Sequence, residues 1–389
     1  MPGPLTGVRI LDLTAVISGP SATMLLADQG ADVIKVENPE AGDLTRYVST
    51  RRGGFTAAFV NNNRNKRSLG LNLKDPKAVE ALKALTKTCD VVVQNFRPGV
   101  VDRLGIGEVA MREVKPDIIY VSISGFGEDG PYAQKPVYDP LVQALSGLTT
   151  VQAGNDEDRP RLIRTIVPDK LTGMAAAQAI TAALFHHAKT GEGQHVKVNM
   201  LDTILAFLWG SDMGGHTFVG DELPKETAQS FIDLVYETQT DFITVAVNND
   251  KQWRNLIRAF DKQEWLEDPR FATPQARSEN INIRLGLIQE VLLTNTAEHW
   301  LAHLDANDVP CAPVLTRREA IRHPQVEANE TVVYSEHPEA GRLRQSRPAA
   351  TFSETPTDIR MTAPSMAQHN AEILREAGLS EEDIKGLIP

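Results

Sequence analysis

Five short apolar runs, each separated from the next by a more polar stretch, mark the first third of the chain. The runs that we expect to be strands are Val8–Thr14, Asp32–Glu37, Ser68–Leu73, Asp90–Phe96 and Asp117–Ile123. Helices are predicted between them, one opening at Ser18 and ending before Gly30, and another beginning at Asp75 with Pro76 in its first turn. This alternation predicts an α/β fold with a parallel sheet covered on both faces. Ligands of such sheets bind beyond the carboxyl ends of the strands.

The stretch from Arg161 to Phe185 carries the residue on which the functional interpretation rests. Leu162–Val167 is predicted to be a short strand that Pro168 ends, because proline has no N–H to donate to a sheet. A run of small helix-forming residues follows, so Asp169 is expected where a strand ends and a helix begins. One interpretation is an N-cap, whose side chain accepts backbone N–H groups. The other is a carboxylate that the positive end of the helix keeps ionised and that acts as a nucleophile.

The second half of the chain shows a weaker pattern. Ala228–Glu237 leads into Thr240–Val247, where apolar and polar residues alternate as in a strand, and a helix is expected to begin at Asn248. In the tail, Gly378 is expected to end one helix and Ser380 to begin another, because acidic residues fill the first turn that follows.

Composition excludes several classes of function. The chain has 389 residues, of which 41% are hydrophobic and 23% charged, so more than one domain is expected. A net charge of -11 argues against a general binder of nucleic acids or anionic membranes. Cys89 and Cys311 lie far apart without metal-ligand spacing, which fits the reducing cytoplasm and predicts no metal site. The first residues do not have the pattern of a secretion signal, so none is expected, and no apolar run approaches the roughly 20 residues that a membrane span needs.

Motifs of several enzyme classes are missing where this fold would carry them. After the first predicted strand the chain reads Thr14–Ser21, which is not the G-x-G-x-x-G of dinucleotide-binding proteins. Nor does the sequence contain a Walker A, HExxH or GxSxG motif. These absences count against nicotinamide oxidoreductases, P-loop ATPases, metalloproteases and serine hydrolases.

Basic residues gather in one part of this acidic chain. Between residues 46 and 74 there is no acidic residue, and the basic ones are Arg46, Arg51, Arg52, Arg64, Lys66, Arg67 and Lys74. Arg51 and Arg52 are interpreted as a solvated face, whereas Asn63–Leu69 is predicted to bind phosphate. A second cluster, Asn95–Gly105, adds an aromatic ring and two arginines, which suit a purine that carries phosphates. The residues therefore favour a phosphorylated adenine cofactor, of which coenzyme A is one.

Motifs along nearly the whole chain resemble those of the class III CoA-transferases. The group includes formyl-CoA transferase and carnitine CoA-transferase, and alpha-methylacyl-CoA racemase belongs to the same superfamily. Singly the motifs are weak, but their order and spacing are specific. They are Gly7–Thr14, Gly30–Glu37, Asn65–Leu69, Asn95–Gly99, Ser124–Tyr132, Lys189–Gln194, Val309–Val314 and Gln368–Leu374.

The resemblance implies a role for particular residues. Asp169 matches the catalytic aspartate, whose carboxylate attacks the acyl-CoA thioester and passes through aspartyl intermediates. Ile17 and Asp139 match positions near the acyl site. Asn38 stands where formyl-CoA transferase has an arginine. The positions that match contacts with CoA are Val16, Asn38, Leu71, Lys74, Asn95, Phe96, Arg97, Arg103, Tyr138 and Met200.

Departures from the family pattern bear on the substrate and on the alternatives. The glycine-rich loop of formyl-CoA transferase is missing, and Ile17 replaces a glutamine; both departures argue against oxalate as acceptor. Ile17 suggests a larger or more apolar acid instead. A racemase needs a second acid/base, a histidine in the family, where this chain has Tyr138. Tyrosine has a pKa of about 10 and is a poor proton shuttle at neutral pH. Transferase is therefore preferred, with a racemase or a non-catalytic CoA-binding protein as alternatives.

The resemblance also implies an architecture. A Rossmann-like large domain is expected from residues 1–200 and 326–389, a smaller α+β domain from 225–325, and a linker from 201–224. It further implies an interlocked, ring-like homodimer in the cytoplasm. Its partners would be acyl-CoA and a small carboxylic acid, with CoA as substrate and no tightly bound cofactor.

Overall fold

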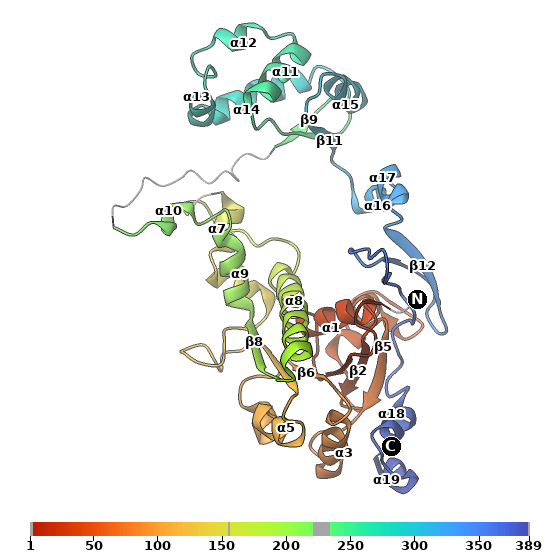
Figure 1. The fold of residues 1–389 in the computed structure, drawn as a ribbon. Helices are drawn as coiled ribbons and strands as arrows, with labels where there is room; N and C mark the ends of the chain where they lie inside the picture. Colours follow the sequence, from red (N-terminus) through yellow and green to blue (C-terminus); the bar gives the residue numbers. More distant parts are fainter. Residues whose placement is uncertain (1–2, 155, 221–233, 388–389) are drawn as a thin grey trace. The chain divides into compact units, whose positions relative to one another are not determined.

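In the computed structural model, which describes residues 3–154, 156–220 and 234–387, a six-stranded sheet organises the larger part of the chain (Figure 1). Every neighbouring pair of its strands is parallel, and the order is β5-β2-β1-β6-β7-β8. The strands are β1 (Arg9–Asp12), β2 (Asp32–Glu37), β5 (Lys66–Gly70), β6 (Val91–Gln94), β7 (Ile119–Ser124) and β8 (His195–Asn199). The predicted α/β fold is confirmed. The strand order reverses between β1 and β6, where sheets of this kind bind ligands.

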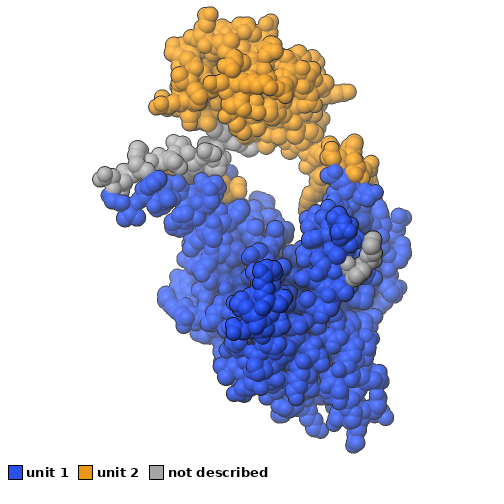
Figure 2. Space-filling model, in the orientation of Figure 1, with its two compact units in different colours: residues 1–149, 160–225, 329–389 blue, residues 150–159, 226–328 orange. Residues whose placement is uncertain are grey.

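The chain divides into two compact units, coloured separately in Figure 2. Unit 1 comprises residues 1–149, 160–225 and 329–389, and unit 2 comprises 150–159 and 226–328; α7 (Leu148–Ala153) spans the boundary. Residues 201–220, expected to be part of a linker, hold all but the first residue of α9 (Met200–Trp209) and the whole of α10 (Gly214–Thr217), both in unit 1. No helix of the described residues is long and apolar enough to cross a membrane.

Helices cover both faces of the large sheet. Neighbouring residues of each strand point to opposite faces, so each strand presents apolar side chains to the helices on both sides. Ile10, Val33 and Val91 pack with apolar residues of α1 and α8, whereas Leu11, Ile34 and Val92 face α3, α5 and the C-terminal helices. Besides α7, α8, α9 and α10, the helices of unit 1 are α1 (Ser18–Asp28), α2 (Ala57–Asn63), α3 (Pro76–Thr86), α4 (Val100–Arg103), α5 (Glu108–Val114), α6 (Asp139–Leu145), α18 (Asn370–Glu376) and α19 (Glu381–Leu387). Short elements complete the unit: the 3-10 helix η1 (Leu44–Arg46) and the hairpins β3 (Arg51–Arg52) with β4 (Phe55–Thr56) and β12 (Val332–His337) with β13 (Gly341–Ser346).

The predicted strand Leu162–Val167 is wrong. Leu162 is 49% exposed, and the Ile163 N–H is bound by the side chain of Gln143 rather than by a neighbouring strand. Helix α8 (Val167–Thr190) begins at Val167 and holds Pro168 in its first turn, where a missing N–H costs nothing. Asp169 therefore lies inside the first turn, and the N-cap interpretation is also wrong, because that position belongs to Ile166.

Unit 2 is built on a small antiparallel sheet, with β10 (Phe242–Val245) between β9 (Val235–Glu237) and β11 (Cys311–Pro313). The strand expected at Thr240–Val247 is confirmed as β10, and the helix expected next is α11 (Asp250–Phe260), capped by Asn249. Most of Ala228–Glu237 lies outside the described residues. The remaining helices are α12 (Glu264–Glu267), α13 (Pro274–Glu279), α14 (Ile281–Leu292), α15 (Ala297–Ala306), α16 (Arg317–Ala320) and α17 (Pro324–Ala328).

Candidate active site

A cavity of about 230 Å³ opens at the carboxyl ends of β1 and β6, where the strand order of the sheet reverses. The predicted residues that line it are Val16, Asn95, Phe96, Arg97, Tyr138, Asp169 and Met200. Lys135 also lines this cavity, with its ammonium 3.9 Å from the centre of the Tyr132 ring, and motif reasoning missed it. Residues from five separate parts of the chain thus meet in one cavity.

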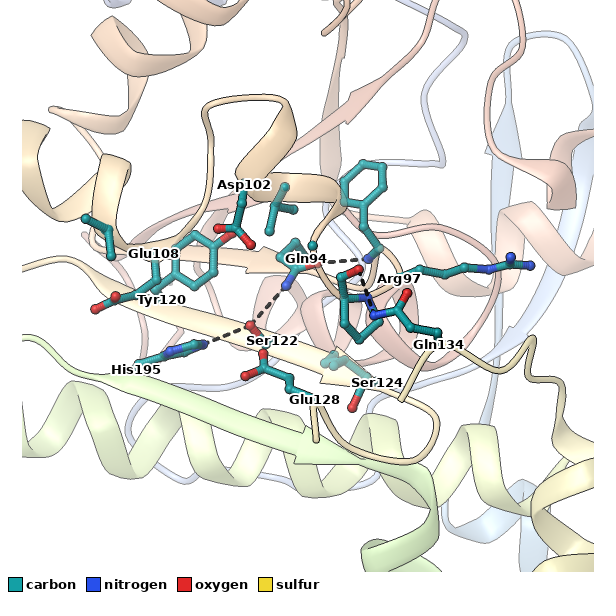
Figure 3. Close-up of a pocket in the computed structure, with 16 residues that line it drawn as sticks. Gln94, Arg97, Asp102, Glu108, Tyr120, Ser122, Ser124, Glu128, Gln134 and His195 are labelled. Atoms are coloured by element: carbon teal, nitrogen blue, oxygen red, sulfur yellow. Dashed lines mark hydrogen bonds between the residues drawn. The ribbon is translucent and has the colours of Figure 1, made fainter. Parts of the chain in front are cut away.

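A second, larger cavity of about 380 Å³ lies beside the first and shares Phe96, Arg97 and Ile123 with it (Figure 3). It extends over β7 and β8, and His195 of β8 forms part of its wall. The sequence interpretation missed it, because β8 has no continuous apolar run and was not predicted as a strand.

The loops after β1 and β6 are joined by one side chain. Asn95 accepts the N–H of Ala15 at 2.9 Å and donates to its carbonyl oxygen at 2.8 Å. Beyond the end of the sheet, the Asn95 amide thus gives both backbone groups of Ala15 the hydrogen bonds that a neighbouring strand would otherwise provide. The two loops therefore form one wall of the first cavity.

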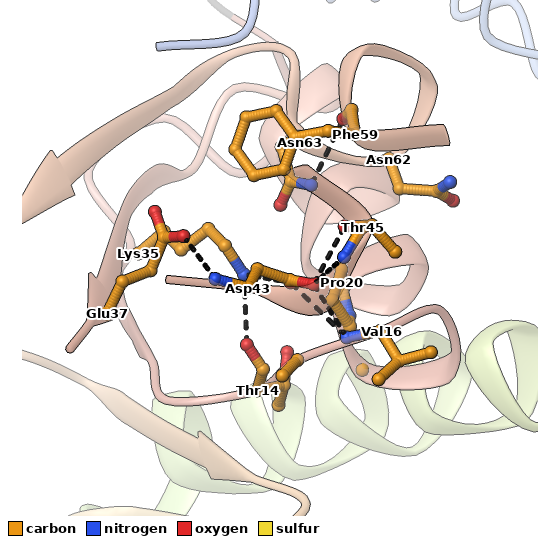
Figure 4. A network of polar contacts seen from close by, with 12 residues as sticks. Thr14, Val16, Pro20, Lys35, Glu37, Asp43, Thr45, Phe59, Asn62 and Asn63 are labelled. Atoms are coloured by element: carbon orange, nitrogen blue, oxygen red, sulfur yellow. Dashed lines mark hydrogen bonds and ion pairs between the residues drawn. The ribbon is translucent and has the colours of Figure 1, made fainter. Parts of the chain in front are cut away.

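The turn after β1 is held by a buried ion pair (Figure 4). Lys35 on β2 binds the carboxylate of Asp43 at 2.9 Å, and both side chains are fully buried. Lys35 also donates to the Thr14 carbonyl at 2.9 Å, and Asp43 accepts the N–H of Val16 at 3.2 Å. Val16 has a φ of 73°, which a β-branched residue rarely adopts, so this network enforces a strained backbone at the cavity wall.

Asp169 reaches the cavity because α8 packs closely against α1. Gly173 lies one turn after Asp169, and a Cβ there would clash with Ser21 and with the Ser18 carbonyl. The glycine therefore lets the first turn of α8 approach the first turn of α1. Ser18, the first residue of α1, lies near the Asp169 carboxylate, and its hydroxyl and backbone N–H lower the pKa of that group.

Burial raises the pKa of Asp169 to about 6, with the nearby Asp139 carboxylate as a further cause and the Ser18 hydrogen bonds as an opposing one. Asp139 is 3% exposed, and burial raises its pKa as well. Its carboxylate accepts the Asp169 N–H at 3.3 Å and the Gln143 amide at 2.6 Å. Asp139 thus supports the start of α8 and also disfavours ionisation of Asp169.

The other predicted contacts also follow carboxyl ends of strands but do not line the first cavity. Asn38, after β2, accepts the N–H groups of Glu40 and Ala41. Lys74 and Arg103 are exposed, after β5 and at the end of α4 respectively. Leu71 is 1% exposed in the hydrophobic core, so its side chain is not available to a ligand.

The prediction that Asn63–Leu69 binds phosphate is wrong, because its cations are already paired with carboxylates. Arg64 pairs with Asp28 at 2.7 Å, and Lys66 pairs with Asp12 at 3.0 Å with both side chains fully buried. Arg67 and Arg46 are likewise paired with carboxylates. In contrast, no ion pair forms between described residues at Lys74, Arg97, Arg103 or Lys135.

The chain is similar to known proteins over nearly its whole length. The family model described as CoA-transferase family III matches residues 5–370. Human succinyl-CoA:glutarate CoA-transferase is 34% identical over 384 residues, which are 96% of this chain and 86% of that protein. Formyl-CoA:oxalate CoA-transferase of Escherichia coli O6:H1 is 32% identical, over all of this chain and 99% of the relative. A crystal structure of a CAIB/BAIF family protein from Brucella suis has a TM-score of 0.83 at 29% identity, covering 97% of this chain and all of that one.

The chain therefore belongs to CoA-transferase family III. The resemblance drawn from the motifs is confirmed, and with it the class of enzyme that these motifs predicted.

Replacing Lys35 by Met should strongly destabilise the protein, because the Asp43 carboxylate then stays buried without its cation. We expect Lys35→Met to lower the free energy of unfolding by about 3–5 kcal/mol. Lys83→Met, which removes a surface pair with Glu80 at 3.1 Å, should cost less than about 1 kcal/mol. Urea denaturation of both variants tests the comparison, and equal losses would contradict it.

Asp169→Asn should make the protein more stable at neutral pH. The native pKa of about 6 exceeds the ordinary value of 3.8, so the cost of ionising Asp169 builds up between about pH 4 and pH 6 and is fully present above pH 6. We expect a gain of about 3 kcal/mol at pH 7 that shrinks as the pH falls below 6 and vanishes below about pH 4. Denaturation at several pH values measures it, with Asp129→Asn, on an exposed loop, as the control for net charge. A gain that is independent of pH would contradict this assignment.

Proposed function

We propose that this protein transfers CoA from an acyl-CoA donor to a free carboxylic acid through covalent intermediates on Asp169. The observation that carries the proposal is the Asp169 carboxylate, partly exposed on a cavity wall at the crossing point of a parallel sheet. Family membership supports the reaction class, and the names of the relatives describe CoA transfer between carboxylic acids.

Four nucleophilic steps complete the proposed reaction. A carboxylate oxygen of Asp169 attacks the thioester carbonyl, the carbon–sulfur bond breaks, and an acyl-aspartyl anhydride and CoA thiolate form. The thiolate attacks the aspartyl carbonyl and releases the donor acid. The acceptor carboxylate then displaces the thiolate from the aspartyl thioester, and the thiolate finally attacks the acceptor carbonyl of the new anhydride. Asp169 is regenerated, and no proton is gained or lost.

The electrostatics of the site suit a carboxylate nucleophile. Burial weakens the solvation of the Asp169 anion, while a pKa of about 6 leaves it mostly ionised at neutral pH. In α8 the N–H groups of Val167, Asp169 and Lys170 are already bonded. At the start of α1 the N–H groups of Ile17 and Gly19 form no hydrogen bond within the described residues, so we assign the developing oxyanion to them.

The unpaired cations at the carboxyl edge of the sheet are assigned to the phosphates of CoA. Lys74, Arg97 and Arg103 have no carboxylate partner among the described residues, so binding a phosphate breaks no ion pair there. Asn95, Phe96, Tyr138, Met200 and Val16 are assigned to the arm that carries the thioester, because they line the cavity of Asp169. Asn38 and the backbone of Leu71 are assigned to the nucleotide end.

The acceptor is proposed to be larger or more apolar than oxalate. Ile17 begins the turn into α1 and lies next to both Val16 and Ser18, so its side chain replaces an amide near the proposed acyl site. Asp139 is the second residue assigned to the acyl site. A screen of acyl-CoA donors against mono- and dicarboxylic acids, read as CoA exchange, identifies the pair that the site prefers.

The lining of the cavity weighs against the racemase alternative. Racemisation needs an acid and a base on opposite faces of the α carbon. The cavity of Asp169 offers Tyr138 as the residue that matches the family histidine, and its described lining contains no histidine.

We also propose a homodimer that works in the cytoplasm. Large apolar side chains are exposed along neighbouring helices of unit 1, which favours a covering partner. They are Leu141 and Leu145 on α6, Met174 and Phe185 on α8, and Phe207 and Trp209 on α9. Both cysteines are free, which fits a reducing compartment.

Asp169→Ala should bind CoA but transfer no acyl group, because the nucleophile is lost while the CoA contacts remain. In the unmodified protein, hydroxylamine added during turnover should convert Asp169 to a hydroxamate that mass spectrometry detects. Binding without any trapped adduct would instead indicate a non-catalytic CoA-binding protein. Exchange of solvent deuterium into an acyl-CoA without an acceptor acid would indicate a racemase.

Asp139→Asn should shift the acid limb of the transfer rate to lower pH. Removing the neighbouring negative charge lowers the pKa of Asp169 from about 6. The asparagine oxygen can still accept the Asp169 N–H at the start of α8, while the hydrogen bond that Asp139 accepts from Gln143 is lost. The pH profile of kcat/KM measures the shift, and a limb that does not move would contradict coupling of the two carboxyl groups.

A further inference from the structure

A chain of hydrogen bonds runs from the loop after β6 to His195 on the edge strand β8 (Figure 3). The N–H of Phe96 donates to Gln94 Oε1 at 2.8 Å, and Gln94 Nε2 donates to Ser122 Oγ at 2.9 Å. Ser122 Oγ lies 2.8 Å from His195 Nε2. Gln94 and Ser122 are each 4% exposed, so the middle of the chain is shielded from water.

The backbone end of this chain fixes the direction of its first two bonds. The Phe96 N–H can only donate, so the Gln94 amide must present its oxygen there and its NH₂ group to Ser122. Among the described residues, His195 Nε2 is the one acceptor that lies within reach of the Ser122 hydroxyl hydrogen, so we assign the third bond to donation from Ser122. In this assignment His195 accepts at Nε2, which requires the neutral ring with its proton on Nδ1.

His195 is placed so that its proton can exchange with solvent. It is partly exposed on the wall of the second cavity, with its ring 5.4 Å from that of Tyr120 and edge-on to it. Glu128 and Lys197 face it as an ion pair, and Glu108 and Arg112 face it from α5 as another, 3.4 Å apart. These pairs largely cancel, and burial lowers the pKa of His195.

We infer that Ser122 and neutral His195 are positioning residues that hold the loop Asn95–Arg97 in the shape that binds CoA. The inference rests on the proposed function, which assigns this loop to CoA. Asn95 of the loop also binds both backbone groups of Ala15, and Phe96 and Arg97 line the cavity of Asp169. A protonated His195 would donate at Nε2, and the Ser122 hydroxyl hydrogen would lose its acceptor. The loop would then be held less firmly.

The test measures the Kd of CoA against pH in the full-length Asp169→Asn protein, so that Asp169 itself no longer titrates. His195→Phe removes the acceptor and should weaken CoA binding about fivefold at neutral pH. His195→Gln supplies an acceptor that does not titrate and should restore most of that affinity. His187→Gln, on α8 and bonded to Asp117, is the matched control and should change nothing.

The pH dependence separates positioning from a merely structural role. Because CoA titrates too, the quantity compared is the Kd of the Asp169→Asn protein divided by the Kd of the same protein that also carries His195→Gln. This ratio should rise about fivefold as the pH falls below the usual histidine pKa of about 6.5. A ratio that stays flat, or a His195→Phe change that lowers only thermal stability, would overturn the inference. If no form binds CoA, the proposed function fails together with the inference.

Discussion

The buried ion pair between Lys35 and Asp43 is the interaction on which the site depends. It joins β2 to the turn after β1 and keeps Val16 in a backbone conformation that a valine would not choose. The same turn leads directly into α1, whose first residue, Ser18, lowers the pKa of the Asp169 carboxylate. Two charges fully removed from water are costly unless each is paired and hydrogen-bonded, and here both conditions are met. The buried Lys35–Asp43 pair therefore fixes the backbone conformation of the cavity wall.

The site itself concentrates destabilising features that the rest of the fold offsets. Two carboxyl groups, Asp139 and Asp169, lie together in a partly desolvated place. Hydrogen bonds from Gln143 and from Ser18 reduce the cost without removing it. Such an arrangement keeps a carboxylate less solvated than in water, which is useful for a nucleophile and unfavourable for stability.

Sequence patterns predicted the parts of this fold that are buried on both sides and failed where burial is one-sided. The five predicted strands of the large sheet form because their apolar runs face helices on both faces. The edge strand β8 was missed because charged Lys197 interrupts its apolar residues. Leu162–Val167 has the composition of a strand but lies near the surface, with Leu162 49% exposed and Ile163, Ile166 and Val167 only partly buried. Charge counts located the basic residues without their partners, because the pairing of Lys66 with Asp12 depends on the sheet order. Asp169 stood out only through family resemblance, since one aspartate beside a proline carries no distinctive pattern.

The close approach of α1 and α8 has a consequence for how such a site can change. Gly173 leaves no room for a side chain against Ser18 and Ser21, although the two helices are far apart along the chain. The reactive carboxylate is consequently carried by the rigid scaffold, whereas the surrounding walls come from connecting segments. New acids could be accommodated by altering those segments alone, while a single methyl group added at the helix crossing would displace the reactive oxygen for every substrate at once.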